Sequence, residues 1–242
     1  MATSPNYETN PIIIALDVDS TTEALALVEK IGPGADFYKV GMELYAVGGM
    51  ALISQIAASG KRVFVDLKLY DIGETVKRAT RQICRSGAAT FLTVHGSRAV
   101  MEAAVEGRGD TNTKLLAVTV LTSFDQEDLA DLGFATPVSD LVALRVRKAV
   151  ESGIDGIVCS PLELARVRSI GGPELQLVTP GVRSAGSEKG DQKRVATPAE
   201  AIRNGANYLV IGRQVTRAAD PRAACQQILD EISLAAQPSS NS

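Results

Sequence analysis

The chain has 242 residues, of which 45% are hydrophobic and 22% are charged, and its formal net charge is −3. This is the composition of an ordinary globular protein with a substantial core, and a slightly acidic chain without a basic block is not expected to bind nucleic acid. It has no apolar run long enough to span a membrane, no signal-peptide pattern, and no zinc motif among three isolated cysteines and one histidine. We therefore expect a cytoplasmic protein with reduced thiols and no membrane contact.

Eight short apolar runs recur along the chain, and most are followed by an amphipathic stretch. Apolar runs without polar alternation are typical of parallel strands covered by helices. The runs lie at residues 12–16, 37–40, 62–67, 90–94, 115–120, 156–159, 175–179 and 208–211.

This rhythm predicts a single (β/α)8 TIM barrel over residues 1–242, with frayed ends at 1–10 and 235–242. A doubly wound open sheet is the alternative. That fold often has a glycine-rich turn after its first strand, whereas this strand ends in Leu16-Asp17-Val18-Asp19-Ser20.

Capping patterns predict where several helices begin. Ser20, Ser160 and Thr197 are each followed three residues later by Glu, and Asp220-Pro221 opens the last amphipathic stretch. The longest connection, between the fifth and sixth runs, contains two more predicted helices at 125–132 and 138–152.

The third run ends in the most informative motif, Asp66-Leu67-Lys68-Leu69-Tyr70-Asp71. Side chains alternate along a strand, so Asp66 and Lys68 are predicted to point the same way, with Asp71 in the turn before the next helix. Charged residues at the end of an aliphatic strand indicate a chemical site. The alternative is a strand-end ion pair with a helix-capping aspartate.

Other polar residues follow the remaining strands, at the end where TIM barrels place their active sites. They are Asp17, Lys39, His95, Thr122, Ser123, Pro180, Arg183, Gly212 and Arg213. A lone histidine such as His95 is more often structural, so it is left out of the predicted site.

The ends of the seventh and eighth runs favour a phosphate site, because glycines allow backbone N–H groups to approach and arginines match phosphate oxygens. Between them, residues 184–192 form a polar, glycine-containing stretch that is typical of a lid. A flexible surface loop beside two solvated arginines is the alternative.

Taken together, these blocks resemble the orotidine 5′-monophosphate decarboxylase family over nearly the whole chain. The resemblance rests on Ile14-Ala15-Leu16-Asp17, Tyr38-Lys39-Val40-Gly41, Asp66–Asp71, Leu121-Thr122-Ser123, Thr179–Arg183, Gly190-Asp191-Gln192 and Ile211-Gly212-Arg213. It implies a carboxy-lyase without metal or cofactor that converts orotidine 5′-monophosphate to uridine 5′-monophosphate and CO2. This reaction is the last step of de novo synthesis of uridine 5′-monophosphate.

The resemblance also implies a role for each matched residue. Lys39, Asp66, Lys68 and Asp71 match a charged array around the reacting carbon, with Lys68 as proton donor. Asp71 and Thr75 match residues that reach the neighbouring subunit's site, which implies a homodimer. The substrate contacts it implies are Asp17 and Lys39 for the ribose, Thr122 and Ser123 for the pyrimidine, and Arg183, Gln192, Gly212 and Arg213 for the phosphate, with Pro180 beside them. This chain departs from the common pattern at Gly73-Glu74, where many members have Pro-Asn.

Two other functions stay open. Related barrels, such as keto-gulonate 6-phosphate decarboxylase and hexulose-phosphate synthase, share the Asp66–Asp71 pattern but use Mg²⁺. Lys39 and the Thr122-Ser123 pair distinguish this chain from them. A non-catalytic barrel that binds a nucleotide phosphate is the other alternative, although it has no need for two lysines beside two aspartates.

Overall fold

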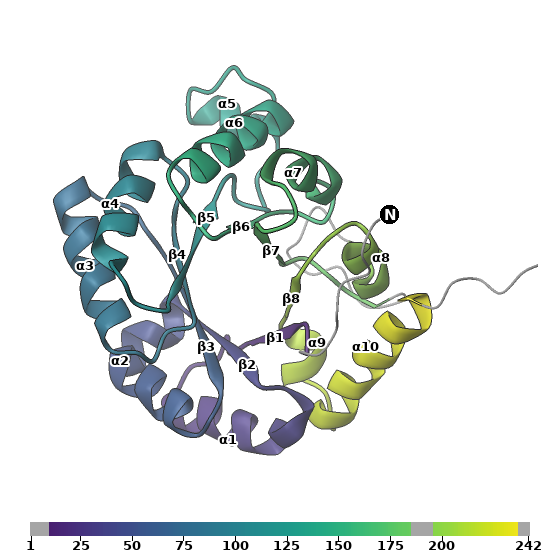
Figure 1. Cartoon of the computed structure of the whole chain (residues 1–242). Coiled ribbons are helices and arrows are strands. Elements are labelled where there is room, and N and C mark those ends of the chain that lie inside the picture. The colour runs from purple at the N-terminus through teal and green to yellow at the C-terminus, as the bar shows by residue number, and fades with distance from the viewer. Residues whose placement is uncertain (1–9, 185–195, 237–242) are drawn as a thin grey trace, which may run out of the picture.

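The computed structural model describes residues 10–184 and 196–236 and contains a closed parallel barrel (Figure 1). Each strand pairs with the next along the chain, and the last pairs with the first, so the predicted TIM barrel is confirmed and the open sheet is not found. The strands are β1 (Ile12–Ala15), β2 (Phe37–Gly41), β3 (Arg62–Leu69), β4 (Phe91–His95), β5 (Lys114–Val118), β6 (Gly156–Val158), β7 (Gln176–Thr179) and β8 (Tyr208–Ile211).

Helices form a ring outside the strands (Figure 1). They are α1 (Thr21–Ile31), the 3₁₀ turn η1 (Gly32–Gly34), α2 (Met42–Ala58), α3 (Gly73–Arg85), α4 (Arg98–Arg108), α5 (Gln126–Asp131), α6 (Val138–Glu151), α7 (Leu164–Gly171), α8 (Pro198–Arg203), α9 (Arg213–Thr216) and α10 (Pro221–Ala236). The two helices predicted between the fifth and sixth strands are present as α5 and α6. Across the described ranges, no helix combines the length and the apolar character needed to cross a membrane.

Three of the four predicted helix starts are correct. Ser20 and Thr197 accept hydrogen bonds from the backbone three residues on, and Asp220 does the same before α10. The start predicted at Ser160 is wrong, because α7 begins only at Leu164. There the Glu163 carboxylate accepts a hydrogen bond from the Ser160 backbone N–H, which stabilises a turn in place of the first helical turn.

The barrel interior is layered, because every second residue of a strand points inward. One layer is apolar and contains Phe37, Phe64, Phe91 and Tyr208, whose ring centroids lie 5.0–5.9 Å apart. Two residues further along β2 and β3, the same inward face carries Lys39 and Asp66. The aromatic layer therefore forms a solid floor beneath a charged layer.

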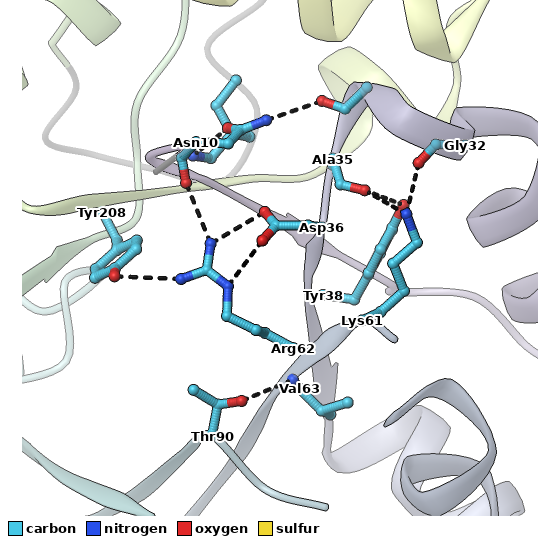
Figure 2. Close-up of polar contacts among 12 residues, drawn as sticks. Asn10, Gly32, Ala35, Asp36, Tyr38, Lys61, Arg62, Val63, Thr90 and Tyr208 are labelled. Carbon is cyan, nitrogen blue, oxygen red and sulfur yellow. Dashed lines mark hydrogen bonds and ion pairs between the residues drawn. The ribbon is translucent and has the colours of Figure 1, made fainter. Parts of the chain in front are cut away.

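Arg62 closes the floor at the amino end of β3 (Figure 2). Its guanidinium makes two hydrogen bonds of 3.0 Å to Asp36, donates to the Tyr208 hydroxyl at 3.3 Å and lies 4.4 Å from the Phe37 ring centroid. It also donates to the backbone carbonyl of Asn10 at 3.4 Å. This network joins β2, β3, β8 and the chain before β1 on the face that TIM barrels use for stability.

The predicted frayed ends are only partly described. Asn10 is anchored, since its side chain donates to Gly34 and accepts from Ile12, and α10 extends to Ala236. The rest of both ends lies outside the described residues. The three cysteines are buried and form no disulfide.

Candidate active site

A cavity of about 570 Å³ opens at the carboxyl ends of the strands, above the charged layer. Most of the predicted site residues line it, and they come from six of the eight strand ends. They are Asp17, Lys39, Asp66, Lys68, Thr122, Ser123, Pro180, Arg183, Gly212 and Arg213. The sequence therefore identified most of the polar wall of this cavity.

Two lysines converge on one buried carboxylate at the bottom of the cavity. Lys68 Nζ lies 2.9 Å from Asp66 Oδ1, and Lys39 Nζ lies 3.7 Å from Asp66 Oδ2. Lys39 Nζ also lies 3.1 Å from Asp17 Oδ1 at the rim. The side chain of Asp66 is only 14% exposed. The result is an alternating row of charges, Asp17, Lys39, Asp66 and Lys68, along one wall.

Asp66 and Lys68 point into the same cavity, as predicted, but β3 is not regular where they lie. Val65 pairs with Leu92 and Leu69 pairs with Val94, which leaves residues 66–68 of β3 opposite residue 93 alone. Lys68 has a φ of 50°, the only positive value for a non-glycine residue in the described chain. Left-handed backbone at such a residue costs roughly 1–2 kcal/mol, and surrounding contacts must hold it in place.

Thr93 supplies such contacts from the neighbouring strand β4. Its hydroxyl accepts a hydrogen bond from the Lys68 backbone N–H at 2.9 Å and donates one to Asp66 Oδ1 at 2.9 Å. Thr93 is fully buried. The bulge in β3 is therefore held by one hydroxyl that contacts both members of the Asp66–Lys68 pair.

The array keeps Asp66 ionised. Burial alone would raise the pKa of Asp66, but the charges of Lys39 and Lys68 and the hydrogen bonds from Lys68 and Thr93 outweigh it and lower that pKa below its ordinary value. A buried carboxylate thus remains negative beside two ammonium groups. Such a site can place fixed charge of both signs against a ligand.

Gly41 makes room for the upper part of this row. A Cβ at Gly41 would lie 3.1 Å from Lys39 Nζ and 3.6 Å from Asp17 Oδ1. Any larger residue would therefore press on the ammonium group. The bare backbone here allows Lys39 to bridge Asp17 and Asp66.

The part of the cavity wall that follows β7 and β8 is basic. Arg183 follows β7, and Arg213 begins the short helix α9 directly after β8, the arrangement that many TIM barrels use to bind phosphate. Arg183 Nε is buried and has no hydrogen-bond partner within the described residues. A buried donor without a protein acceptor is available to a ligand oxygen.

Three predicted residues are not part of the described cavity. Asp71 and Thr75 are exposed and do not line it, and the carboxylate of Asp71 accepts a hydrogen bond from the Ile72 backbone instead. Gln192, with most of the stretch interpreted as a lid, lies outside the described residues. His95 does not line the cavity; its ring lies 4.1 Å from that of Tyr70.

Sequence reasoning missed other residues of the site. Thr93 could have been noticed, because it is a polar residue inside an otherwise apolar strand. Nothing in the sequence around Gly41 indicates that this glycine belongs to the site. Three charged residues that also line the cavity, Asp19, Glu43 and Arg217, gave no signal that separates them from ordinary surface charges.

The carboxylates of the charged array, Asp17 and Asp66, are possible ligands for a metal ion. Among the described residues, no group of three or more His, Cys, Asp or Glu side chains is placed to hold a metal ion. Instead, the ammonium group of Lys39 lies between the carboxylates of Asp17 and Asp66.

Comparison with known proteins gives a consistent result. The family described as "Orotidine 5′-phosphate decarboxylase / HUMPS family" matches residues 10–228. The chain is 52% identical to orotidine 5′-phosphate decarboxylase of Rhodopseudomonas palustris strain HaA2, over 97% of this chain and 100% of the relative. It is 54% identical to that of strain BisA53, over 91% of this chain and 94% of the relative. The crystal structure of orotidine 5′-phosphate decarboxylase from Lactobacillus acidophilus superposes with a TM-score of 0.82 at 34% identity, covering 93% of this chain and 99% of that one.

Proposed function

Because the chain belongs to the orotidine 5′-phosphate decarboxylase/HUMPS family, we propose that its cavity decarboxylates orotidine 5′-monophosphate to uridine 5′-monophosphate and CO2. This reaction is the last step in making uridine 5′-monophosphate, and the proposed mechanism uses neither metal nor cofactor. The observation that carries the proposal is the convergence of Lys39 and Lys68 on the buried carboxylate of Asp66. A barrel that only binds a phosphate has no use for this array in addition to the arginines.

Loss of CO2 from the pyrimidine ring leaves a carbanion in the ring plane, where its charge cannot spread well into the carbonyl groups. Fixed positive charge beside that carbon stabilises the transition state, most of all in a site that excludes water. We assign this role to Lys68, whose ammonium can then deliver the proton that replaces CO2. Asp66 orients the ammonium group of Lys68 through their 2.9 Å contact.

Asp66 has a second effect on the substrate. The substrate is bound as a carboxylate, and a second negative charge beside it raises the energy of the bound ground state. That repulsion is relieved as the carboxylate leaves as neutral CO2, so Asp66 penalises the ground state more than the transition state. Lys39 and Asp17 lie at the rim, where the ribose hydroxyls are expected, and Thr122 and Ser123 contact the pyrimidine.

The basic wall holds the phosphate, at a distance from the bond that breaks. Arg183 and Arg213 offer fork-shaped donors, and Gly212 and Pro180 line the cavity beside them. The resemblance assigns Gln192, which lies outside the described residues, to the phosphate as well. Such contacts cannot act on the reacting carbon directly. Their binding energy can instead offset the cost of ordering substrate and charged groups around that carbon.

We further propose that the enzyme is a homodimer in which Asp71 and Thr75 reach the partner's cavity. In the single chain both residues are exposed and away from the cavity. The flanking side chains Tyr70 and Ile72 are 69% and 72% exposed, so a partner that packed on this turn would bury apolar surface. A second copy that covers them would also bring Asp71 to the other chain's Lys68.

The Mg²⁺-dependent alternative is disfavoured by Lys39. In that chemistry, carboxylates at the rim bind a divalent cation. Here an ammonium lies 3.1 Å from Asp17 and 3.7 Å from Asp66, so the positive charge between these carboxylates already belongs to the protein.

The test is an absorbance assay of orotidine 5′-monophosphate consumption, with and without EDTA. We expect turnover that EDTA does not inhibit. Lys68→Ala is expected to reduce kcat by at least about 10⁴-fold, since it removes both the stabilising charge and the proton donor, while uridine 5′-monophosphate still binds. Decarboxylation by Lys68→Ala near the wild-type rate would rule out Lys68 as the donor. An inactive wild-type protein would rule out the function.

A further inference from the structure

The two arginine-bearing loops of the basic wall are joined by a pair of side chains that the mechanism does not use. Ser184 directly follows Arg183, and Gln214 directly follows Arg213. The Gln214 side chain accepts a hydrogen bond from the Ser184 backbone N–H at 3.2 Å and donates one to the Ser184 hydroxyl at 2.7 Å. Both residues are half-buried. One amide therefore connects the chain after β7 to the chain after β8.

The backbone before Ser184 makes a second set of contacts, to residue 196. Val182 and Ala196 form an isolated parallel bridge, and the Arg183 N–H donates to the Ala196 carbonyl at 3.0 Å. Arg183 thus lies between a backbone pairing and the contact to Gln214. Gln214 itself lies in α9, whose first turn is closed by hydrogen bonds from Val215 and Thr216 to the Gly212 carbonyl.

We propose that Gln214 and Ser184 are positioning residues that set the separation of Arg183 and Arg213 for a phosphate group. Arg183 Nε is buried and has no hydrogen-bond partner among the described residues, so its placement depends on the backbone that carries it. A planar guanidinium binds phosphate through directed hydrogen bonds, which lose strength when the two forks are wrongly spaced. The Ser184–Gln214 pair fixes that spacing before any ligand arrives.

This inference rests on the proposed function, and it predicts an effect specific to the phosphate group. Gln214→Met keeps the length and volume of the side chain but loses both hydrogen bonds. We expect it to weaken binding of uridine 5′-monophosphate about tenfold, the scale of one to two hydrogen bonds, and to lower kcat/KM for orotidine 5′-monophosphate equally. Binding of uridine, which has no phosphate, should change less than about twofold, because it does not use the spacing of the two arginines.

Ser184→Ala provides a milder second variant, because it loses the hydroxyl contact and keeps the backbone one. We expect it to weaken uridine 5′-monophosphate binding about threefold, and Ser184→Ala combined with Gln214→Met should equal Gln214→Met alone, because both act through one contact. Gln226→Met is the matched control, since Gln226 makes an exposed hydrogen bond to Asp230 on α10, and it should bind both ligands as the wild type does.

The outcomes separate the two proposals. If the wild type does not consume orotidine 5′-monophosphate, the proposed function fails, and ligand binding still tests the pair. If the wild type is active but Gln214→Met binds uridine 5′-monophosphate normally, the positioning role is wrong. Equal losses for uridine and uridine 5′-monophosphate would also overturn it, because a merely structural contact would affect both ligands alike.

Discussion

Thr93 is the residue whose single hydroxyl holds the central ion pair of the site. In Thr93→Val the Lys68 N–H loses its acceptor and Asp66 loses a donor, so the bulge at residues 66–68 is less well fixed. We expect kcat/KM to fall about 100-fold, the cost of a misplacement near 1 Å, and stability to fall by about 1–3 kcal/mol. Steady-state kinetics and urea unfolding measure the two effects.

The matched control for this prediction lies at the other end of the same pair of strands. Thr90 Oγ1 accepts a hydrogen bond from the Val63 backbone N–H at 3.3 Å, near the floor of the barrel (Figure 2). Thr90→Val should therefore reduce stability without reducing turnover. If Thr93→Val and Thr90→Val had the same kinetics, Thr93 would be a structural residue only.

His95 is the only histidine of the chain, which makes its titration easy to isolate. Burial, together with the positive charge of Arg145, lowers the pKa of His95 to about 4, and its Nδ1 has no hydrogen-bond partner among the described residues. In the unfolded chain His95 binds a proton near its ordinary pKa of 6.5, while in the folded protein the His95 side chain stays neutral at that pH. Stability should therefore be lost as the pH falls from about 6.5 towards about 4.

His95→Phe removes the titrating group but keeps a ring that can stack on Tyr70. As the pH is lowered through this window, the unfolding free energy of the wild type should fall relative to that of the variant. NMR of the single histidine gives its pKa directly. A measured value near 6.5 would contradict the prediction.

Individual strands and helices show what local sequence can predict. The bounds of all eight strands lie within two residues of the apolar runs. A parallel strand that is buried on both faces needs a continuous run of apolar residues, and such a run is visible in the sequence alone. The bulge at the end of β3 could not be predicted, because it depends on the register against β4. The start of α7 was missed for a related reason: Ser160 and Glu163 fit a helix cap and a turn equally well.

The placement of the candidate site residues around the cavity follows from the strands that carry them. Asp17, Lys39 and Asp66 follow from strand ends alone, since parallel strands bring their carboxyl ends to one mouth. The arginines after β7 and β8 follow in the same way. The contacts that fix this geometry, through Thr93 and through Gln214, join residues distant in sequence, and no local pattern indicates them.

The packing of α3 against α4 depends on Gly107. A Cβ at this position would lie 2.3 Å from the backbone oxygen of Lys77, which no side-chain adjustment can relieve. Gly107→Ala should therefore push the two helices apart and destabilise the protein by about 1–3 kcal/mol. Thermal unfolding measures the change.

Gly73, at the start of α3, is the natural comparison. A Cβ there would lie 3.6 Å from the Ala103 side chain, an ordinary contact. Gly73→Ala should be neutral or stabilise the protein by up to about 1 kcal/mol, since alanine limits the unfolded chain more than glycine does. This is also the turn where the chain departs from the common Pro-Asn of the family. A melting temperature for Gly107→Ala at or above that of Gly73→Ala would disprove the packing argument.

The whole molecule separates stability from chemistry along the barrel axis. The amino end is closed by the aromatic layer and by the Arg62 network, whose contacts Figure 2 shows. The carboxyl end carries the charged array, the left-handed backbone at Lys68, and the buried Arg183 Nε, which has no hydrogen-bond partner within the described ranges. The backbone strain at Lys68 and the burial of a donor at Arg183 each cost free energy. The tightly packed amino end of the barrel can hold these residues in place at the carboxyl end.

If each subunit contributes Asp71 to its partner's cavity, as proposed, a prediction follows that only the dimer can test. Lys68→Ala and Asp71→Asn should each be nearly inactive as pure homodimers. In a mixed dimer, if Asp71 acts across the interface, one site carries both defects and the other carries neither. Refolding the two variants together at equal concentration should then restore about a quarter of the wild-type activity, because half of the dimers are mixed and each has one intact site. Size-exclusion chromatography confirms the dimer. If activity stays near zero in a mixture that does form mixed dimers, Asp71 acts within its own chain, and the exposed position it occupies here must change when substrate binds.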